Sequence, residues 1–184
     1  MKYIFVSDIF GKTAHLSHFA RQFNTDHLIV DPYNGELQVV SDDQQQYAHF
    51  VFKCNHDGYV NKLNSILNKM TTETTVIAFS AGGAAAWRSI AHVKNPHIKK
   101  LIAFYPNQIR NYLDIVSPIP CELIFPANEQ HYDIQHIVKR LSQQVHIKCI
   151  VSDYKHGFMN PLSAGFNSAG YQHFCKYLLP ENSL

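Results

Sequence analysis

The sequence predicts an α/β fold: a single domain built on a mostly parallel sheet of about six strands, with helices on both faces. Two observations predict it. Short apolar runs of strand length alternate with longer segments that have helical periodicity, which is typical of parallel sheets covered on both sides. No internal repeat, linker or low-complexity tract divides residues 1–184, so we expect one compact domain.

Six short apolar runs predict the strands. They are rich in valine, isoleucine and phenylalanine, which favour extended backbone. Turn-forming residues end several of them, such as Asp31-Pro32 after the second run. In chain order, the predicted strands are residues 2–7, 27–30, 74–79, 100–105, 122–125 and 146–151.

Six segments predict the helices. Residues 59–70 have five apolar side chains on one stripe, which is the pattern of a helix packed on a core. Residues 42–52 are polar and glutamine-rich, and only the helical spacing of three apolar residues favours a helix there. In chain order, the predicted helices are residues 14–23, 42–52, 59–70, 81–92, 133–144 and 171–179.

Ser80 lies at the junction between a predicted strand and an alanine-rich helix. The small residues Ala78 and Gly82 stand two positions before and two after it, as a sharp strand-to-helix turn requires. Such a turn exposes the serine hydroxyl, and the helix dipole favours negative charge beside it. The pattern fits a catalytic nucleophile, and it also fits an ordinary serine N-cap at a strand–helix junction.

A serine nucleophile needs a histidine base and an acid that orients the base. At a turn of this kind the chain order is serine, acid, histidine, with the last two on loops after later strands. Glu129 and His156 follow the predicted strands 122–125 and 146–151 in that order, and Asp133 is an alternative acid. Because ligand sites in parallel sheets lie beyond the carboxyl ends of the strands, we expect these side chains to converge.

Several short motifs, taken together, resemble the dienelactone hydrolase family of the α/β-hydrolase superfamily, as a small variant with a serine nucleophile. The resemblance extends from about residue 3 to residue 178. The motifs are Ser80-Ala81-Gly82-Gly83, His156-Gly157-Phe158, Asn160-Pro161, Val6-Ser7-Asp8-Ile9-Phe10-Gly11 and Asp31-Pro32-Tyr33.

The resemblance implies roles for these residues. Ser80 would be the nucleophile, Glu129 the acid and His156 the base, and the backbone N–H groups of Ile9 and Ala81 would form the oxyanion hole. Four further residues are candidates for the pocket or its modulation: Asp8, Phe10, Tyr105 and Phe158. For Asp8 an Asx-turn after the first strand is an equally good interpretation, and Phe158 could instead anchor its loop.

The chain departs from the family pattern in four respects. Serine replaces the cysteine of many members, Ala78 replaces a glycine of the turn, and Glu129 and Pro126 replace the more usual aspartate and glycine. The chain is also shorter than typical members. These departures leave two functions open. One is a carboxylesterase- or thioesterase-like serine hydrolase that cleaves a small ester, thioester or lactone through an acyl-enzyme. The other is a non-catalytic binding or regulatory protein with a degenerate triad.

Composition and charge limit the classes of binding partner that the protein is expected to have. The formal net charge is +2 without a basic run, which argues against nucleic acid. The longest apolar runs have strand length, so we expect no membrane span, and no signal peptide is visible. The four cysteines lack paired spacing, which favours a cytoplasmic location. The 12 histidines include no convincing metal-ligand spacing, so we expect no metal and no cofactor. A small-molecule ester is the expected partner, and the sequence is compatible with a homodimer.

Overall fold

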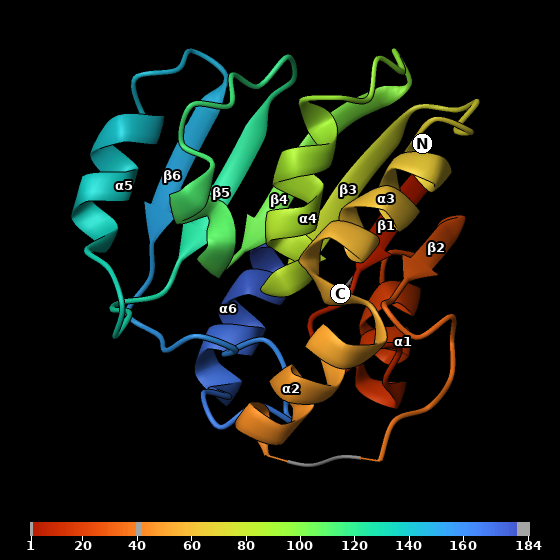
Figure 1. The fold of residues 1–184 in the computed structure, drawn as a ribbon, viewed down its shortest axis with the longest axis vertical. Helices are drawn as coiled ribbons and strands as arrows, with labels where there is room; N and C mark the ends of the chain where they lie inside the picture. The colour runs from red at the N-terminus through yellow and green to blue at the C-terminus, as the bar shows by residue number, and fades with distance from the viewer. Residues whose placement is uncertain (1, 40–41, 180–184) are drawn as a thin grey trace.

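Six parallel strands form the centre of the computed structural model, which describes residues 2–39 and 42–179. Their order across the sheet is β2-β1-β3-β4-β5-β6, so the chain starts near the middle and builds outward in both directions. Figure 1 shows the strands side by side. They are β1 (Lys2–Val6), β2 (His27–Val30), β3 (Thr74–Phe79), β4 (Ile98–Phe104), β5 (Cys121–Phe125) and β6 (Ile147–Val151).

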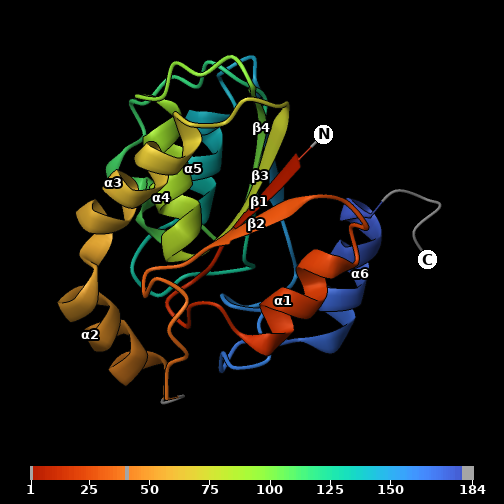
Figure 2. The ribbon, with the colours of Figure 1, turned by 90° about the vertical axis from the view of Figure 1, so that its right-hand side faces the viewer.

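Helices cover both faces of the sheet, as Figure 2 shows in edge view. Helices α1 (Ala14–Arg21) and α6 (Ser168–Leu178) lie on one face. Helices α3 (Asn55–Leu67), α4 (Ala81–Ile90) and α5 (Ile134–Leu141) lie on the other. The fold class expected from the sequence is thereby confirmed.

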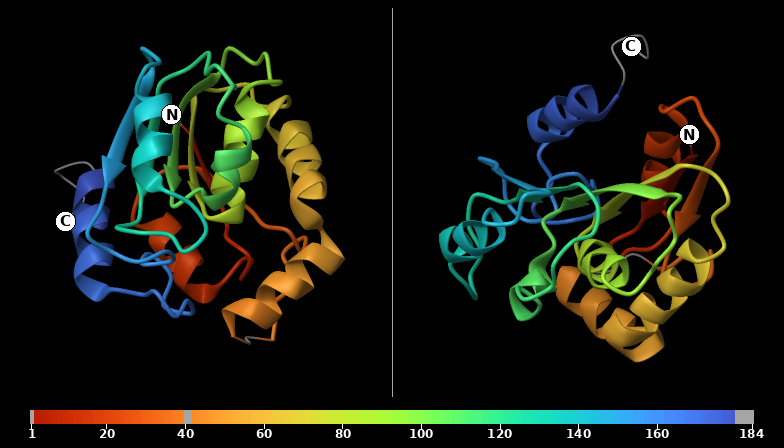
Figure 3. Two further views of the ribbon diagram at one scale, coloured as in Figure 1. Left: turned by 60° about the vertical axis from the view of Figure 1, so that its left-hand side comes forward. Right: turned by 90° about the horizontal axis from the view of Figure 1, so that it is seen from above.

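Helix α2 (Asp43–Lys53) leads into α3 and lies beyond the carboxyl ends of the strands (Figure 3). Its first residue is preceded by Asp42, whose carboxylate accepts a hydrogen bond from the Gln45 N–H and caps the helix. The glutamine-rich segment therefore does form a helix. A short 3-10 helix, η1 (Asn107–Asn111), follows β4 and was not expected from the sequence.

Two apolar cores lie on opposite sides of the sheet, because successive strand residues point to opposite faces. On β1, Ile4 and Val6 belong to the core under α3 and α4, whereas Phe5 belongs to the core under α1 and α6. Trp87 on α4 is fully buried in the first core and donates its indole N–H to the Tyr112 carbonyl. Trp87 is thus a core residue.

The pairing register of β1, β3 and β4 brings the carboxyl ends of these strands to one level. Val6 pairs with Ala78, and Ala78 pairs with Ala103, so β1, β3 and β4 end at nearly the same level. Because the strands are parallel, the loops that follow them begin at one edge of the sheet. Within the described residues, no helix has the length and apolar character needed to cross a membrane.

Candidate active site

Ser80 occupies the turn between β3 and α4 with an unusual backbone conformation. Its φ is 49° and its ψ is −115°, in a region that residues other than glycine rarely adopt. The turn is held by two hydrogen bonds: the Ser80 N–H donates to the Phe104 carbonyl over 2.9 Å, and the Ser80 carbonyl accepts from the Ala84 N–H over 3.0 Å. A strained turn of this kind projects the hydroxyl away from the sheet.

Gly82 allows the turn to approach β1. A Cβ atom at this position would lie 2.2 Å from the Ser7 carbonyl oxygen and 2.8 Å from that of Val6. No real Cβ atom is found at such distances, so any side chain here would push α4 away from the end of β1. The small residue expected from the sequence thus serves a specific purpose, because it brings Ser80 close to the loop that follows Ser7.

The hydroxyl of Ser80, the imidazole of His156 and the carboxylate of Glu129 form a continuous hydrogen-bonded chain. Ser80 Oγ lies 2.8 Å from His156 Nε2, and His156 Nδ1 lies 2.6 Å from Glu129 Oε1. The Glu129 side chain is only 9% exposed, whereas that of His156 is 31% exposed. The acid is thus shielded, and the ring that it holds remains open to the pocket.

Asp133, the alternative acid, has a different role. Its carboxylate accepts a hydrogen bond from the Gln135 N–H and caps the first turn of α5. It makes no hydrogen bond or ion pair with His156 among the described residues. Of the two acids considered from the sequence, the structure therefore places Glu129, and not Asp133, against the imidazole.

Two glycines shape the loop that holds His156. Gly157 has a φ of +81°, a backbone conformation that would be strained for a residue with a side chain. A Cβ atom on Gly165 would lie 1.8 Å from the His156 carbonyl oxygen, so the returning loop passes against the histidine backbone. The ring of Tyr105 packs on the imidazole with centroids 4.9 Å apart. The histidine is therefore fixed by its backbone, its ring face and its carboxylate partner.

Ile9 and Ala81, the expected oxyanion-hole donors, both line the pocket beside Ser80. Ala81 is the first residue of α4, where a backbone N–H has no partner within the helix. The carbonyl of Asp8 accepts hydrogen bonds from Ser7 Oγ and the Gly11 N–H. Because the C=O and N–H of a trans peptide point in opposite directions, these bonds set the direction of the Ile9 N–H.

Asp8 is a buried carboxylate at the edge of this pocket. One oxygen accepts from the Phe10 N–H over 3.0 Å, which is an Asx-turn, and the other accepts from Asn160 Nδ2 over 2.7 Å. Burial raises the pKa of Asp8 to about 6, although the hydrogen bonds from Asn160 and Phe10 oppose the shift. Asp8 is therefore both a turn residue and a charged group facing the site.

The pocket at Ser80 is a cavity of about 180 Å³. Phe10 and Tyr105, two of the candidates named from the sequence, line it. Phe158 does not: its side chain is fully buried in the core under α6, against Phe104 and Phe174. Of the two interpretations of Phe158, a pocket residue or an anchor of its loop, the structure favours the anchor, because its ring is buried among aromatic core residues.

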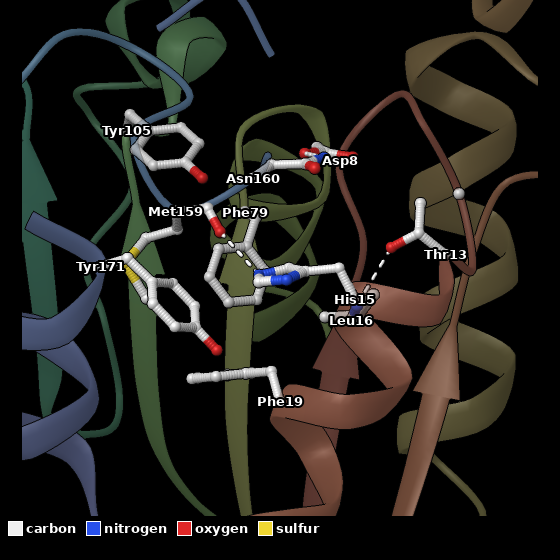
Figure 4. A pocket seen from close by; sticks show the side chains of 11 residues that line it. Asp8, Thr13, His15, Leu16, Phe19, Phe79, Tyr105, Met159, Asn160 and Tyr171 are labelled. Atoms are coloured by element: carbon white, nitrogen blue, oxygen red, sulfur yellow. Dashed lines mark hydrogen bonds between the residues drawn. The ribbon is translucent and has the colours of Figure 1, made fainter. Parts of the chain in front are cut away.

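A second, smaller cavity of about 20 Å³ lies on the α1 and α6 side of the pocket. Asp8 and Tyr105 border both cavities and therefore form the partition between them. Figure 4 shows Asp8 beside Asn160, with the Tyr105 hydroxyl directed toward the same space and His15 hydrogen-bonded to the Met159 carbonyl. The volume corresponds to about one water molecule, so this space does not extend the pocket for a substrate.

The structure adds pocket residues that the sequence did not identify. They come from α2, the start of α3, η1 and the loop after His156, and they are polar. They are Asp43, Tyr47, His56, Asn107, Gln108 and Ser163. No local pattern marks them, because α2 and η1 reach the pocket only through the folding of the sheet. Within the described residues, no group of three or more potential metal-binding side chains is found.

Known proteins resemble this chain at two levels. No protein-family model matches it. In sequence, the uncharacterised protein YczH of Bacillus subtilis is 28% identical over 174 residues, which cover 90% of this chain and 84% of that protein. Solved structures share little sequence identity with this chain but have a similar fold, so they show the fold alone.

Three of these structures are described as dienelactone hydrolases or dienelactone hydrolase-like. A Klebsiella pneumoniae protein proposed to be a dienelactone hydrolase matches 96% of this chain and 83% of its own, with a TM-score of 0.71 and 17% identity. The fold is that of the dienelactone hydrolases.

The other two structures have the same fold. The dienelactone hydrolase of Anabaena variabilis matches 96% of this chain and 84% of its own, with a TM-score of 0.60 and 12% identity. A dienelactone hydrolase-like, promiscuous phosphotriesterase from metagenomic libraries matches the same shares, with a TM-score of 0.66 and 14% identity.

Proposed function

We propose that the protein is a serine hydrolase that cleaves a small ester, thioester or lactone through an acyl-enzyme. One observation carries the proposal. Ser80 Oγ lies 2.8 Å from His156 Nε2, and His156 Nδ1 lies 2.6 Å from Glu129 Oε1. This is the geometry in which a histidine takes a proton from a serine while an acid holds the ring. The dienelactone hydrolase fold supports the same reaction class.

In the first step, Ser80 Oγ attacks the carbonyl carbon of the substrate as its proton moves to His156 Nε2. The negative charge passes to the carbonyl oxygen, for which the N–H groups of Ile9 and Ala81 are the proposed donors. Loss of one such donor typically costs about 3–4 kcal/mol of transition-state stabilisation. The N-terminus of α4 favours the same charge.

In the second step, His156 gives its proton to the leaving group, and the acyl group remains on Ser80. Water then attacks the acyl carbon with His156 again acting as the base, and the proton returns to Ser80 Oγ. Throughout, Glu129 holds Nδ1–H and stabilises the imidazolium without taking its proton. The exposed side of the imidazole is consistent with access of water to the acyl-enzyme.

A non-catalytic binding role requires that the triad geometry has decayed, and the distances of 2.8 Å and 2.6 Å do not favour decay. A fluorophosphonate probe tests the proposal directly. We expect the probe to label the wild type and not Ser80→Ala, with Ser65→Ala, an exposed serine on α3, as the labelled control. Absence of labelling of the folded wild type would overturn the proposal and favour the binding role.

A further inference from the structure

The lysine, arginine, aspartate and glutamate side chains that line the Ser80 pocket are all acidic among the described residues. Two carboxylates line it, Asp8 and Asp43, and no lysine or arginine lines it among the described residues. Burial raises the pKa of Asp8 to about 6, so its carboxylate is ionised at pH 8. Burial, together with the charge of Arg88, lowers the pKa of His56 below its usual value, so this imidazole is neutral at pH 8.

Two arginines, Arg88 and Arg110, act electrostatically on the pocket residue His56, and each has partners of its own. Arg88 forms an ion pair with Asp57 at 2.7 Å, and its guanidinium lies over the Tyr112 ring. Arg110 bonds to Asn107 and lies over the ring of Tyr132, with 5.2 Å between guanidinium carbon and ring centroid. Neither arginine is among the residues that line the cavity.

Asp43 stands at the first turn of α2, on the wall of the pocket formed by that helix. Its Oδ2 accepts hydrogen bonds from Ser163 Oγ over 3.3 Å and from the Ala164 N–H over 3.4 Å. Within the described residues Oδ1 has no such donor, and the side chain is half-buried. A carboxylate on the pocket wall favours a cation and repels an anion.

We propose that this pocket selects substrates by charge: it accepts esters whose acyl group is neutral or carries an ammonium group, and it discriminates against acyl groups that end in a carboxylate. Asp43 is the specificity-determining residue. Asp8, which lines the same pocket, adds to the same field. The inference rests on the proposed hydrolase activity and names the substrate class of the same site.

Three p-nitrophenyl esters with the same three-methylene acyl spacer test it. They are the pentanoate, which ends in methyl, the monoester of glutarate, which ends in carboxylate, and the 4-(trimethylammonio)butanoate, which ends in a cation. We expect kcat/KM, corrected for uncatalysed hydrolysis at pH 8, to be at least about tenfold lower for the glutarate than for the pentanoate. The cationic ester should equal or exceed the pentanoate.

Two isosteric variants then assign the effect. Asp43→Asn should reduce the ratio of cationic to anionic kcat/KM by roughly fivefold. Asp42→Asn is the matched control: it removes the same charge one residue away, Asp42 does not line the pocket, and asparagine is an equally good helix cap. It should leave the ratio unchanged.

The possible failures are distinguishable. If the esters are hydrolysed in a Ser80-dependent manner and the glutarate is cleaved as fast as the pentanoate, the charge selection is overturned and the hydrolase proposal stands. If discrimination is present but Asp42→Asn reduces it as much as Asp43→Asn, the assignment to Asp43 is overturned. If no ester is hydrolysed and the fluorophosphonate does not label Ser80, the proposed function fails, and the charge selection that rests on it fails too.

Discussion

Asn160 Nδ2 donates a hydrogen bond of 2.7 Å to Asp8 Oδ2, which joins the loop of His156 to the loop that follows β1. The two residues are far apart in the sequence, and both are buried. The bond therefore links the element that would supply the base to the element that would supply an oxyanion donor. It also places a carboxylate where solvent cannot stabilise its charge, and this has a measurable consequence.

The pKa of Asp8 makes stability depend on pH. Burial raises it from 3.8 to about 6, so the folded protein binds this proton more tightly than the unfolded chain does. The stabilising contribution of protonated Asp8 is present below about pH 4 and is lost as the pH rises through about 6. At 1.36 kcal/mol per pKa unit, the difference corresponds to about 3 kcal/mol.

Asp8→Asn should abolish this dependence. Urea unfolding of the wild type and of Asp8→Asn at pH 4.5 and pH 7.5 gives the difference in unfolding free energy between the two proteins at each pH. We expect the variant to gain about 2 kcal/mol relative to the wild type between the two pH values. A difference that does not change with pH would show that Asp8 titrates near its ordinary value.

Glu129→Gln should lower kcat for ester hydrolysis by about a hundredfold or more, because glutamine cannot stabilise the imidazolium that forms during attack. Asp133→Asn is the matched control, since asparagine preserves the cap of α5. It should leave kcat unchanged within about twofold. A larger loss from the Asp133 variant would show that the loop rearranges in solution and that Asp133 is the acid.

Gly82→Ala should destabilise the protein by about 2 kcal/mol or more, since its Cβ would lie 2.2 Å from the Ser7 carbonyl oxygen, a backbone atom. Gly83→Ala on the same helix is the comparison. There the nearest atom, Pro106 Cβ, lies 3.2 Å away, and the gain in helix propensity is the same. Equal changes in urea midpoint for the two variants would contradict the close approach of α4 to β1.

Ser80→Gly should increase stability by about 1 kcal/mol and eliminate hydrolysis. Glycine adopts the φ of 49° without the steric cost that a residue with a Cβ atom incurs. Ser80→Ala removes the hydroxyl but keeps the strain, so only the glycine variant should show the gain. Thermal unfolding of both variants separates the two effects, and a less stable Ser80→Gly would contradict a strained turn.

The sequence was sufficient for most of the fold. The strands 27–30 and 74–79 have the predicted bounds, because turn residues end both of them. The helix predicted at 59–70 instead spans Asn55–Leu67, and the Asn55 side chain accepts hydrogen bonds from the Asp57 and Gly58 N–H groups. An apolar stripe does not reveal this start, since the residues before the stripe are polar.

Local chemistry determined what could be predicted of this protein. The alternation of strands and helices, the small residues around Ser80 and the chain order of Ser80, Glu129 and His156 follow from periodicity and from the steric demands of a tight turn. Periodicity and the tight turn depend on neighbours in the sequence, and the chain order is read from the sequence directly.

Only the tertiary structure decided which loops meet. It placed Glu129 and not Asp133 against His156, directed Phe158 into the aromatic core and brought Asp43 from α2 to the pocket that Asp8 also lines. These outcomes depend on strand order, register and the path of each loop, which join residues distant in the chain. No local pattern encodes such distances, because they are set by the packing of the whole sheet and its helices.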